Sequence, residues 1–206
     1  MTVLAIDTAS RRRALCIVAG AHGQVVAAQP LSGRDLDRQL LPALADLLRN
    51  DGVDAVACVL GPGSYTGLRV GIAAALGVAH ARDLPLHGID ALDAVARTAP
   101  ADAAEIEAVA DAGRGALYVA RYRREGDEFH LTEPARRVEA GEWQPASHWV
   151  AVGLDGIPGT LDGSPRAAGA LAAAAAAALA QPPLPRTGLE PVYLTGSGSA
   201  PARPRV

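Results

Sequence analysis

The stretch GPGSYTGLRVGIAAALGVA, residues 61–79, restricts the fold more than any other part of the sequence. It begins as a glycine-rich loop and continues as a run of small and apolar residues that is typical of a buried helix. Such a loop could bind phosphate through its amides, but the P-loop lysine and the G-x-G-x-x-G spacing are both missing. We therefore favour a structural role, in which glycines allow tight turns and Ser64 or Thr66 caps the helix. The loop residues with this role are Gly61, Pro62, Gly63, Ser64 and Gly67.

The predicted helix after this loop has two apolar sides. Its flat side carries small residues at a spacing of four: Gly67, Gly71 and Ala75. The second side carries Leu68, Ile72 and Leu76. A helix that is apolar all round must be covered all round, and its own sheet covers one side. The leucine-rich helix predicted over 36–48, or a second protein, could cover the flat side, and we favour the second protein.

Apolar runs and turn signals predict the remaining elements. In the first half, strands are expected at 3–6, 14–18, 24–28, 55–60 and 84–89, with helices at 36–48, 65–80 and 92–98. This is the element order of the ribonuclease-H-like fold. The second half repeats it in shorter form, with strands at 106–110, 116–122, 128–131 and 149–152 and a helix at 167–180. An internal duplication is therefore predicted, with a first lobe at 1–99, a smaller second lobe at 100–195 and a disordered tail at 196–206.

Polar groups at the strand ends are the candidates for chemistry. Asp7 and Thr8 follow the first strand, and Asp111 follows the corresponding strand of the second half. Two such aspartates could orient Mg²⁺ and a nucleotide, although Asp is also a common cap of turns, which we favour. The histidines form no HxxxH or HxxH pair, and no G-x-S-x-G motif is present. No metal site and no complete catalytic constellation are expected.

Composition narrows the function classes. All 19 basic residues are arginines, the net charge is −3, and the arginines form no strongly basic run. A chain that bound nucleic acid alone would usually show a basic face, so any RNA contact is expected to depend on a partner. No secretory leader is recognised, the longest apolar run is too short to span a bilayer, and Cys16 and Cys58 lie in apolar runs as expected of buried thiols. A cytoplasmic protein is predicted.

Several stretches together resemble one family. They are LAIDTAS at 4–10, LLP at 40–42, residues 61–79, DAGRGALYVARY at 111–122 and PVYL at 191–194. In this order they resemble the TsaB (YeaZ) family, whose specific signature is the 61–79 stretch. The resemblance covers most of the chain and is weakest between 123 and 190.

The resemblance implies a two-lobed actin/Hsp70-like fold and a function in tRNA modification. Family members are partners, without catalytic activity of their own, of TsaD, which transfers threonylcarbamoyl to adenosine 37 of tRNAs that read ANN codons. TsaE, an ATPase, joins them, tRNA is contacted indirectly, and the isolated proteins can form homodimers. ATP or ADP with Mg²⁺ is a candidate ligand of the cleft only in the full complex, with Asp7, Thr8 and Asp111 as its candidate contacts.

The family contact with TsaD is a bundle built from the helices that correspond to 36–48 and 65–80. The expected interface residues are Leu40, Leu44, Leu47, Tyr65, Leu68, Gly71, Ile72, Ala75 and Leu76. On this basis Gly71→Leu or Ala75→Arg should abolish partner binding and leave a folded monomer. If either change instead unfolds the chain, the flat side of the helix faces the protein's own core.

This sequence departs from the family pattern at polar positions. Leu36-Asp37-Arg38-Gln39 precedes LLP where His-Ser-Glu is usual, and Gly113 replaces the first arginine of the second-lobe motif. Ala116-Leu117 replace Glu-Val there, and Thr195 replaces an arginine. The alternative functions are a small ATPase or kinase of the same superfold, which would use Asp7, Thr8 and the 61–67 loop, and a protease, which the missing nucleophile–base pair argues against.

Overall fold

The computed structural model describes residues 1–20, 22–49, 52–145, 149–151, 161–162, 166–187 and 189–194. The predicted tail at 196–206 lies outside these residues. None of the helices in the described part of the chain is long and apolar enough to cross a membrane.

The first sheet is built by the first ninety residues. Its strands are β1 (Thr2–Asp7), β2 (Arg13–Gly20), β3 (Val25–Ser32), β4 (Ala55–Gly61) and β5 (Leu86–Asp90). They lie in the order β3-β2-β1-β4-β5. The pairs β1–β2 and β2–β3 are antiparallel, while β1–β4 and β4–β5 are parallel.

The second sheet repeats this plan. Its strands are β6 (Glu105–Gly113), β7 (Ala116–Glu125), β8 (Glu128–Glu139), β9 (Trp149–Ala151) and β10 (Leu161–Asp162). The order β8-β7-β6-β9-β10 has the same sequence of neighbours and directions as β3-β2-β1-β4-β5. This confirms the predicted duplication and the two-lobed α/β fold of the actin/Hsp70-like type.

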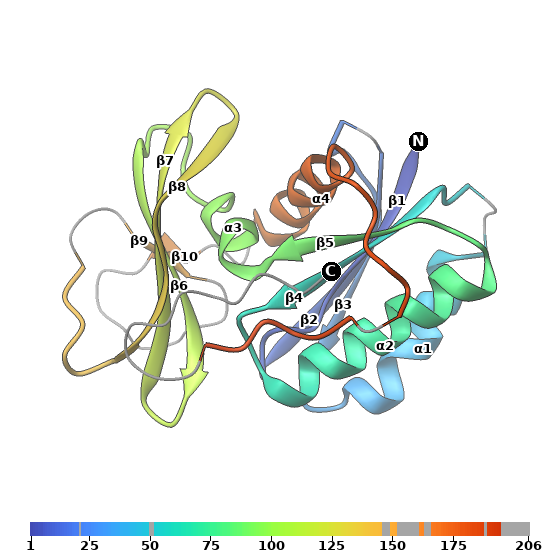
Figure 1. Cartoon of the computed structure of the whole chain (residues 1–206), viewed down its shortest axis with the longest axis horizontal. Helices are drawn as coiled ribbons and strands as arrows, with labels where there is room; N and C mark the ends of the chain where they lie inside the picture. The colour runs from blue at the N-terminus through green and yellow to red at the C-terminus, as the bar shows by residue number, and fades with distance from the viewer. Residues whose placement is uncertain are drawn as a thin grey trace.

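Four helices complete the described fold: α1 (Leu36–Leu47), α2 (Tyr65–Ala81), α3 (Ala91–Ala96) and α4 (Ala167–Ala178). Helices α1 and α2 cover one face of the first sheet, α4 covers the other, and α3 lies between the two sheets (Figure 1). The last helix of the second half therefore packs on the first sheet. The division of the chain near residue 99 stays a prediction.

The strand alternation explains this layering, because successive side chains point to opposite faces of a sheet. In β1, Val3 and Ala5 join the core beneath α4, while Leu4 and Ile6 join the core beneath α1 and α2. All seven residues of β4 are buried, since both faces of this central strand are covered.

After α4 the chain returns over the first lobe. The amide of Leu184 donates to the carbonyl of Leu86 at 2.7 Å, and the amide of Val192 donates to the carbonyl of Leu60 at 2.8 Å. The segment then runs past α2 toward the second lobe, where Leu194 is buried beside α3 and β6 (Figure 1). We call residues 189–194 the C-terminal segment.

Candidate functional site

The two strand-end aspartates face one cleft between the lobes. This cleft is lined by residues that include Asp7, Ala9, Pro62, Val95, Ala110 and Asp111. One carboxylate oxygen of Asp7 accepts from the amide of Ala9 at 2.9 Å, and that of Asp111 accepts from the amide of Gly113 at 2.7 Å. The same Asx turn is thus formed at the end of the first strand of each lobe. Each aspartate stabilises its own turn, as the capping interpretation expects.

Thr8 does not join them in the cleft. Its side chain is buried, and its hydroxyl donates to the carbonyl of Gly67 in α2 at 2.7 Å. The hydroxyl is therefore directed into the helix layer, because the end of β1 is bonded to the first turn of α2. The structure does not bring Thr8 to the position expected for a cofactor contact.

The glycine loop packs against the chain rather than opening on a ligand. The amide of Ser64 donates to the carbonyl of Ala9 at 2.7 Å, and a Cβ placed on Gly63 would lie 2.6 Å from that carbonyl oxygen. Gly61 has φ of +131°, a backbone conformation suited to glycine. Ser64 is the N-cap of α2, and its Oγ accepts from the amide of Gly67 at 3.3 Å. The glycines allow the backbones of the loop, β1 and the C-terminal segment to approach closely.

The cleft is small. Its cavity volume is about 50 Å³, whereas pockets for small molecules and cofactors usually have about 300–1,000 Å³. Within the described residues, no three His, Cys, Asp or Glu side chains gather closely enough to hold a metal ion.

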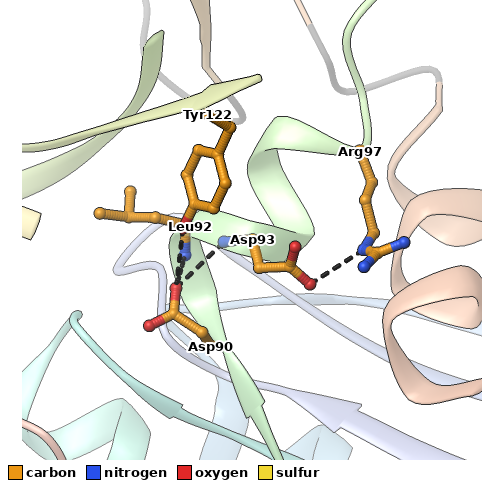
Figure 2. Close-up of polar contacts among 5 residues, drawn as sticks. All are labelled: Asp90, Leu92, Asp93, Arg97 and Tyr122. Carbon is orange, nitrogen blue, oxygen red and sulfur yellow. Dashed lines mark hydrogen bonds and ion pairs between the residues drawn. The ribbon is translucent and has the colours of Figure 1, made fainter. Parts of the chain in front are cut away.

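A polar contact joins the lobes beside the cleft (Figure 2). Asp90, at the end of β5, is the N-cap of α3 and accepts from the amides of Leu92 at 2.8 Å and Asp93 at 3.0 Å. The hydroxyl of Tyr122, on β7, approaches the same carboxylate oxygen at 3.5 Å. Desolvation of the carboxylate raises the pKa of Asp90 although the residue keeps an exposed side, and the two backbone hydrogen bonds oppose this shift. Burial and the charge of Asp90 raise the pKa of Tyr122, so its hydroxyl stays protonated.

Most residues of the expected interface are buried in this structure. Seven of its nine residues are buried within this chain: Leu40, Leu44, Leu47, Leu68, Gly71, Ile72 and Ala75. The flat side of α2 packs on the end of β1, since a Cβ on Gly71 would meet the side chain of Thr8. These residues therefore offer little surface to a partner in this conformation. Gly71→Leu is therefore expected to perturb folding, contrary to the prediction from the sequence.

Other residues of the same helices are available to a partner. Tyr65 is 54% exposed and Leu76 is half-buried, as an interface would require. The sequence prediction missed Leu41, which is 67% exposed, and the exposed residues Ala45, Ala73 and Gly77. We call Leu41, Ala45, Ala73 and Gly77 the outer helical face. The signal for it is Arg69, because the arginine of an otherwise apolar helix marks its solvent side, on which Ala73 and Gly77 follow at a spacing of four.

Comparisons with known proteins agree with this architecture. The family model described as TsaD, tRNA N6-adenosine threonylcarbamoyltransferase, matches residues 30–142. The tRNA threonylcarbamoyladenosine biosynthesis protein TsaB of Escherichia coli is 33% identical over 74% of this chain and 71% of its own length. TsaB of Haemophilus influenzae is 33% identical over 61% of this chain and 55% of its own length. The solved structure of YeaZ from Pseudomonas aeruginosa superposes with a TM-score of 0.73 and 26% identity, covering 94% of this chain and 99% of that one.

Proposed function

The chain belongs to the TsaB (YeaZ) family of tRNA threonylcarbamoyladenosine biosynthesis proteins, and on that premise we propose that it is a non-catalytic partner of TsaD. It scaffolds and activates TsaD during threonylcarbamoyl transfer to adenosine 37 of tRNAs that read ANN codons. The contact is made by α1 and α2. TsaE joins the complex, tRNA is held mainly by the assembly, and the same surface supports a homodimer when TsaD is absent. The cytoplasm is the proposed compartment.

The observation that carries this proposal is the outer helical face. Two helices on the same side of the first sheet expose apolar side chains, and Leu41 is a large one at 67% exposure. Ala73 and Gly77 add a flat surface on α2, against which another helix backbone can pack closely. Apolar residues grouped on one face are typical of interaction sites.

The cleft supports a role without catalysis of its own. Asp7 and Asp111 each stabilise a turn, Thr8 is bonded to α2, and the cavity between the lobes has about 50 Å³. A nucleotide therefore requires a wider separation of the lobes than this conformation has. If ATP or ADP with Mg²⁺ binds here, we assign that binding to the full complex.

Mixing with TsaD from the same genome tests the proposal. Size-exclusion chromatography with light scattering reports the complex, and a threonylcarbamoyl-tRNA assay is run with and without this chain. We expect a heterodimer and activity that depends on it. Ala73→Arg should abolish both while the monomer stays folded, whereas Ala177→Arg, at an exposed alanine of α4 on the opposite face of the sheet, should not. A heterodimer that survives Ala73→Arg refutes the assigned surface, and ATP turnover by the isolated chain would favour the ATPase or kinase alternative.

A further inference from the structure

A cluster of arginine and tyrosine side chains lies at the N-terminal ends of α1 and α2. Two exposed residues, Arg11 and Arg34, line a groove of about 490 Å³ together with Tyr65. The ring of Tyr65 stacks on that of Tyr193 with a centroid distance of 5.3 Å. Arg69 lies 4.2 Å above the Tyr65 ring, and its Nε donates to the Tyr193 hydroxyl at 3.2 Å. We call these five residues the Arg–Tyr patch.

We propose that the Arg–Tyr patch binds a nucleotide unit of RNA, with its phosphate at Arg11 and Arg34 and its base against the stacked tyrosines. The proposal goes beyond the scaffold function, because it gives this chain its own contact with the RNA substrate.

The groove is large enough for a small molecule and has polar groups in its lining. Its volume lies within the range of small-molecule sites. The volume of the cleft between the lobes is below that range. Three hydroxyl side chains line it beside the arginines: Ser10, Ser64 and Thr66. The planar guanidinium of arginine matches a phosphate with two parallel hydrogen bonds. Asp37 is the acidic group in the lining, so the two arginines leave the groove with a net positive charge.

The aromatic pair is held in place before any ligand binds. Tyr193 belongs to the C-terminal segment, and the preceding residue, Val192, is bonded to Leu60, which fixes this segment beside α2. Tyr65 remains 54% exposed although it is stacked. Exposed aromatic rings flanked by arginines are how proteins stack unpaired RNA bases. Glu190 is close enough to Arg69 to act on it electrostatically, so part of that positive charge is offset.

Arg11 is also positioned in advance. A Cβ placed on Gly113 of the second lobe would lie 3.2 Å from Nη2 of Arg11 and 3.4 Å from its Cζ. The guanidinium therefore lies against the backbone of the Gly113 turn, which limits the side-chain entropy lost on binding. Among the described residues no ion pair neutralises Arg11 or Arg34, whereas Arg69 already contacts the two tyrosines and is partly offset by Glu190. The charges of Arg11 and Arg34 are available to an anionic ligand.

The contact is weak in the isolated chain, because two or three arginines supply few phosphate contacts and the net charge is −3. It adds to the hold on RNA that a partner provides. On α2 the outer helical face begins at Ala73, two helical turns after Tyr65 and one turn after Arg69, so the groove borders the partner surface.

The test measures binding of a labelled RNA hairpin with a single-stranded loop, by fluorescence anisotropy over a series of salt concentrations. We expect Arg11→Gln and Arg34→Gln each to weaken binding and to lower the slope of log affinity against log salt by about 0.7. Tyr65→Ala should weaken binding by about fivefold or more with an unchanged slope. Arg49→Gln is the control, since Arg49 is an exposed arginine of the same lobe that lies outside the patch, where it pairs with Asp46.

Two further arms separate the sources of the effect. Each variant is mixed with TsaD, and adenosine monophosphate replaces the RNA in a parallel titration. If the patch variants bind RNA like the wild-type chain, or reduce only TsaD binding, the surface belongs to a protein interface and the proposal is overturned. If the chain binds adenosine monophosphate but does not bind the hairpin, the proposal is also overturned. Ala73→Arg should no longer bind TsaD, but its RNA binding should show the same salt dependence as that of the wild-type chain. A failure of the scaffold function can therefore be distinguished from a failure of the RNA site.

Discussion

Gly71→Ala is the substitution that best tests the packing of α2. A Cβ on Gly71 would lie closer than 3.0 Å to Oγ1 of Thr8, and 3.2 Å and 3.3 Å from its Cβ and Cγ2. Thr8 cannot move freely, because its hydroxyl donates to the carbonyl of Gly67 and its side chain is buried. The new methyl group must therefore displace Thr8 from α2 or displace α2 from the sheet.

The expected cost follows from three terms. Overpacking a buried site costs about 1–3 kcal/mol, and loss of the buried hydrogen bond of Thr8 costs a further 1–3 kcal/mol, roughly. Alanine is better than glycine inside a helix by about 0.5–1 kcal/mol, which offsets part of this. With mid-range values, the free energy of unfolding should fall by about 3 kcal/mol.

Urea denaturation followed by circular dichroism measures this change. Gly77→Ala is the control in the same helix: a Cβ there meets nothing within 4 Å, so stability should rise by about 0.5–1 kcal/mol. In a Thr8→Ala background the clashing Oγ1 and Cγ2 are absent, and Gly71→Ala should be close to neutral. Equal effects at Gly71 and Gly77, or no rescue by Thr8→Ala, would refute this account of the helix.

The remaining predictions concern a carboxylate, two thiols and a cap. Desolvation raises the pKa of Asp90, so the folded chain binds this proton more tightly than the unfolded chain does. The free energy of unfolding of the wild type should therefore fall, relative to that of Asp90→Asn, as pH rises from 3 through the raised pKa. Urea midpoints measured across this pH range test the sign. Burial raises the pKa of Cys16 and Cys58 to about 12. Neither thiol should react with a thiol reagent at pH 8 before urea is added. The free energy of unfolding should fall between pH 9 and 12, because the thiols ionise at lower pH in the unfolded chain than in the folded one. Ser64→Ala removes the bond to Gly67 and should cost about 1 kcal/mol in urea titration, with Ser64→Asp restoring it.

Much of the fold could be predicted from periodicity and turn residues. The expected strand at 55–60 and helix at 65–80 are observed as Ala55–Gly61 and Tyr65–Ala81. The prediction was wrong for the strand at 128–131, which continues to Glu139. That extension carries Pro134 and several charged residues, which are depleted in strands generally but tolerated in an edge strand such as β8. The two-residue strand β10 is too short to leave a pattern.

The site was harder to predict because α2 carries apolar residues on nearly every side, with Arg69 as the one charged residue that marks its solvent side. Periodicity reveals the stripes of such a helix but does not tell which stripe faces the sheet. The small residues at 67, 71 and 75 favour close approach of a backbone; Gly67 does approach the backbone of Thr8, the residue after β1, whereas Gly71 faces the Thr8 side chain. Tyr193 was outside any sequence expectation for the site, since stacking with Tyr65 joins residues 128 positions apart in the chain.

The glycines in and after the loop that resembles a phosphate site are required for folding. Gly63, Gly67 and Gly71 all approach the backbone or side chains of residues 8 and 9 closely, so a larger residue at any of them perturbs the joint between β1 and α2. Gly77 lies in open space on the same helix, so a larger residue there leaves the fold intact and alters only what can bind. Two glycines of one helix therefore separate the two requirements: Gly71 reports on folding, and Gly77 reports on the partner.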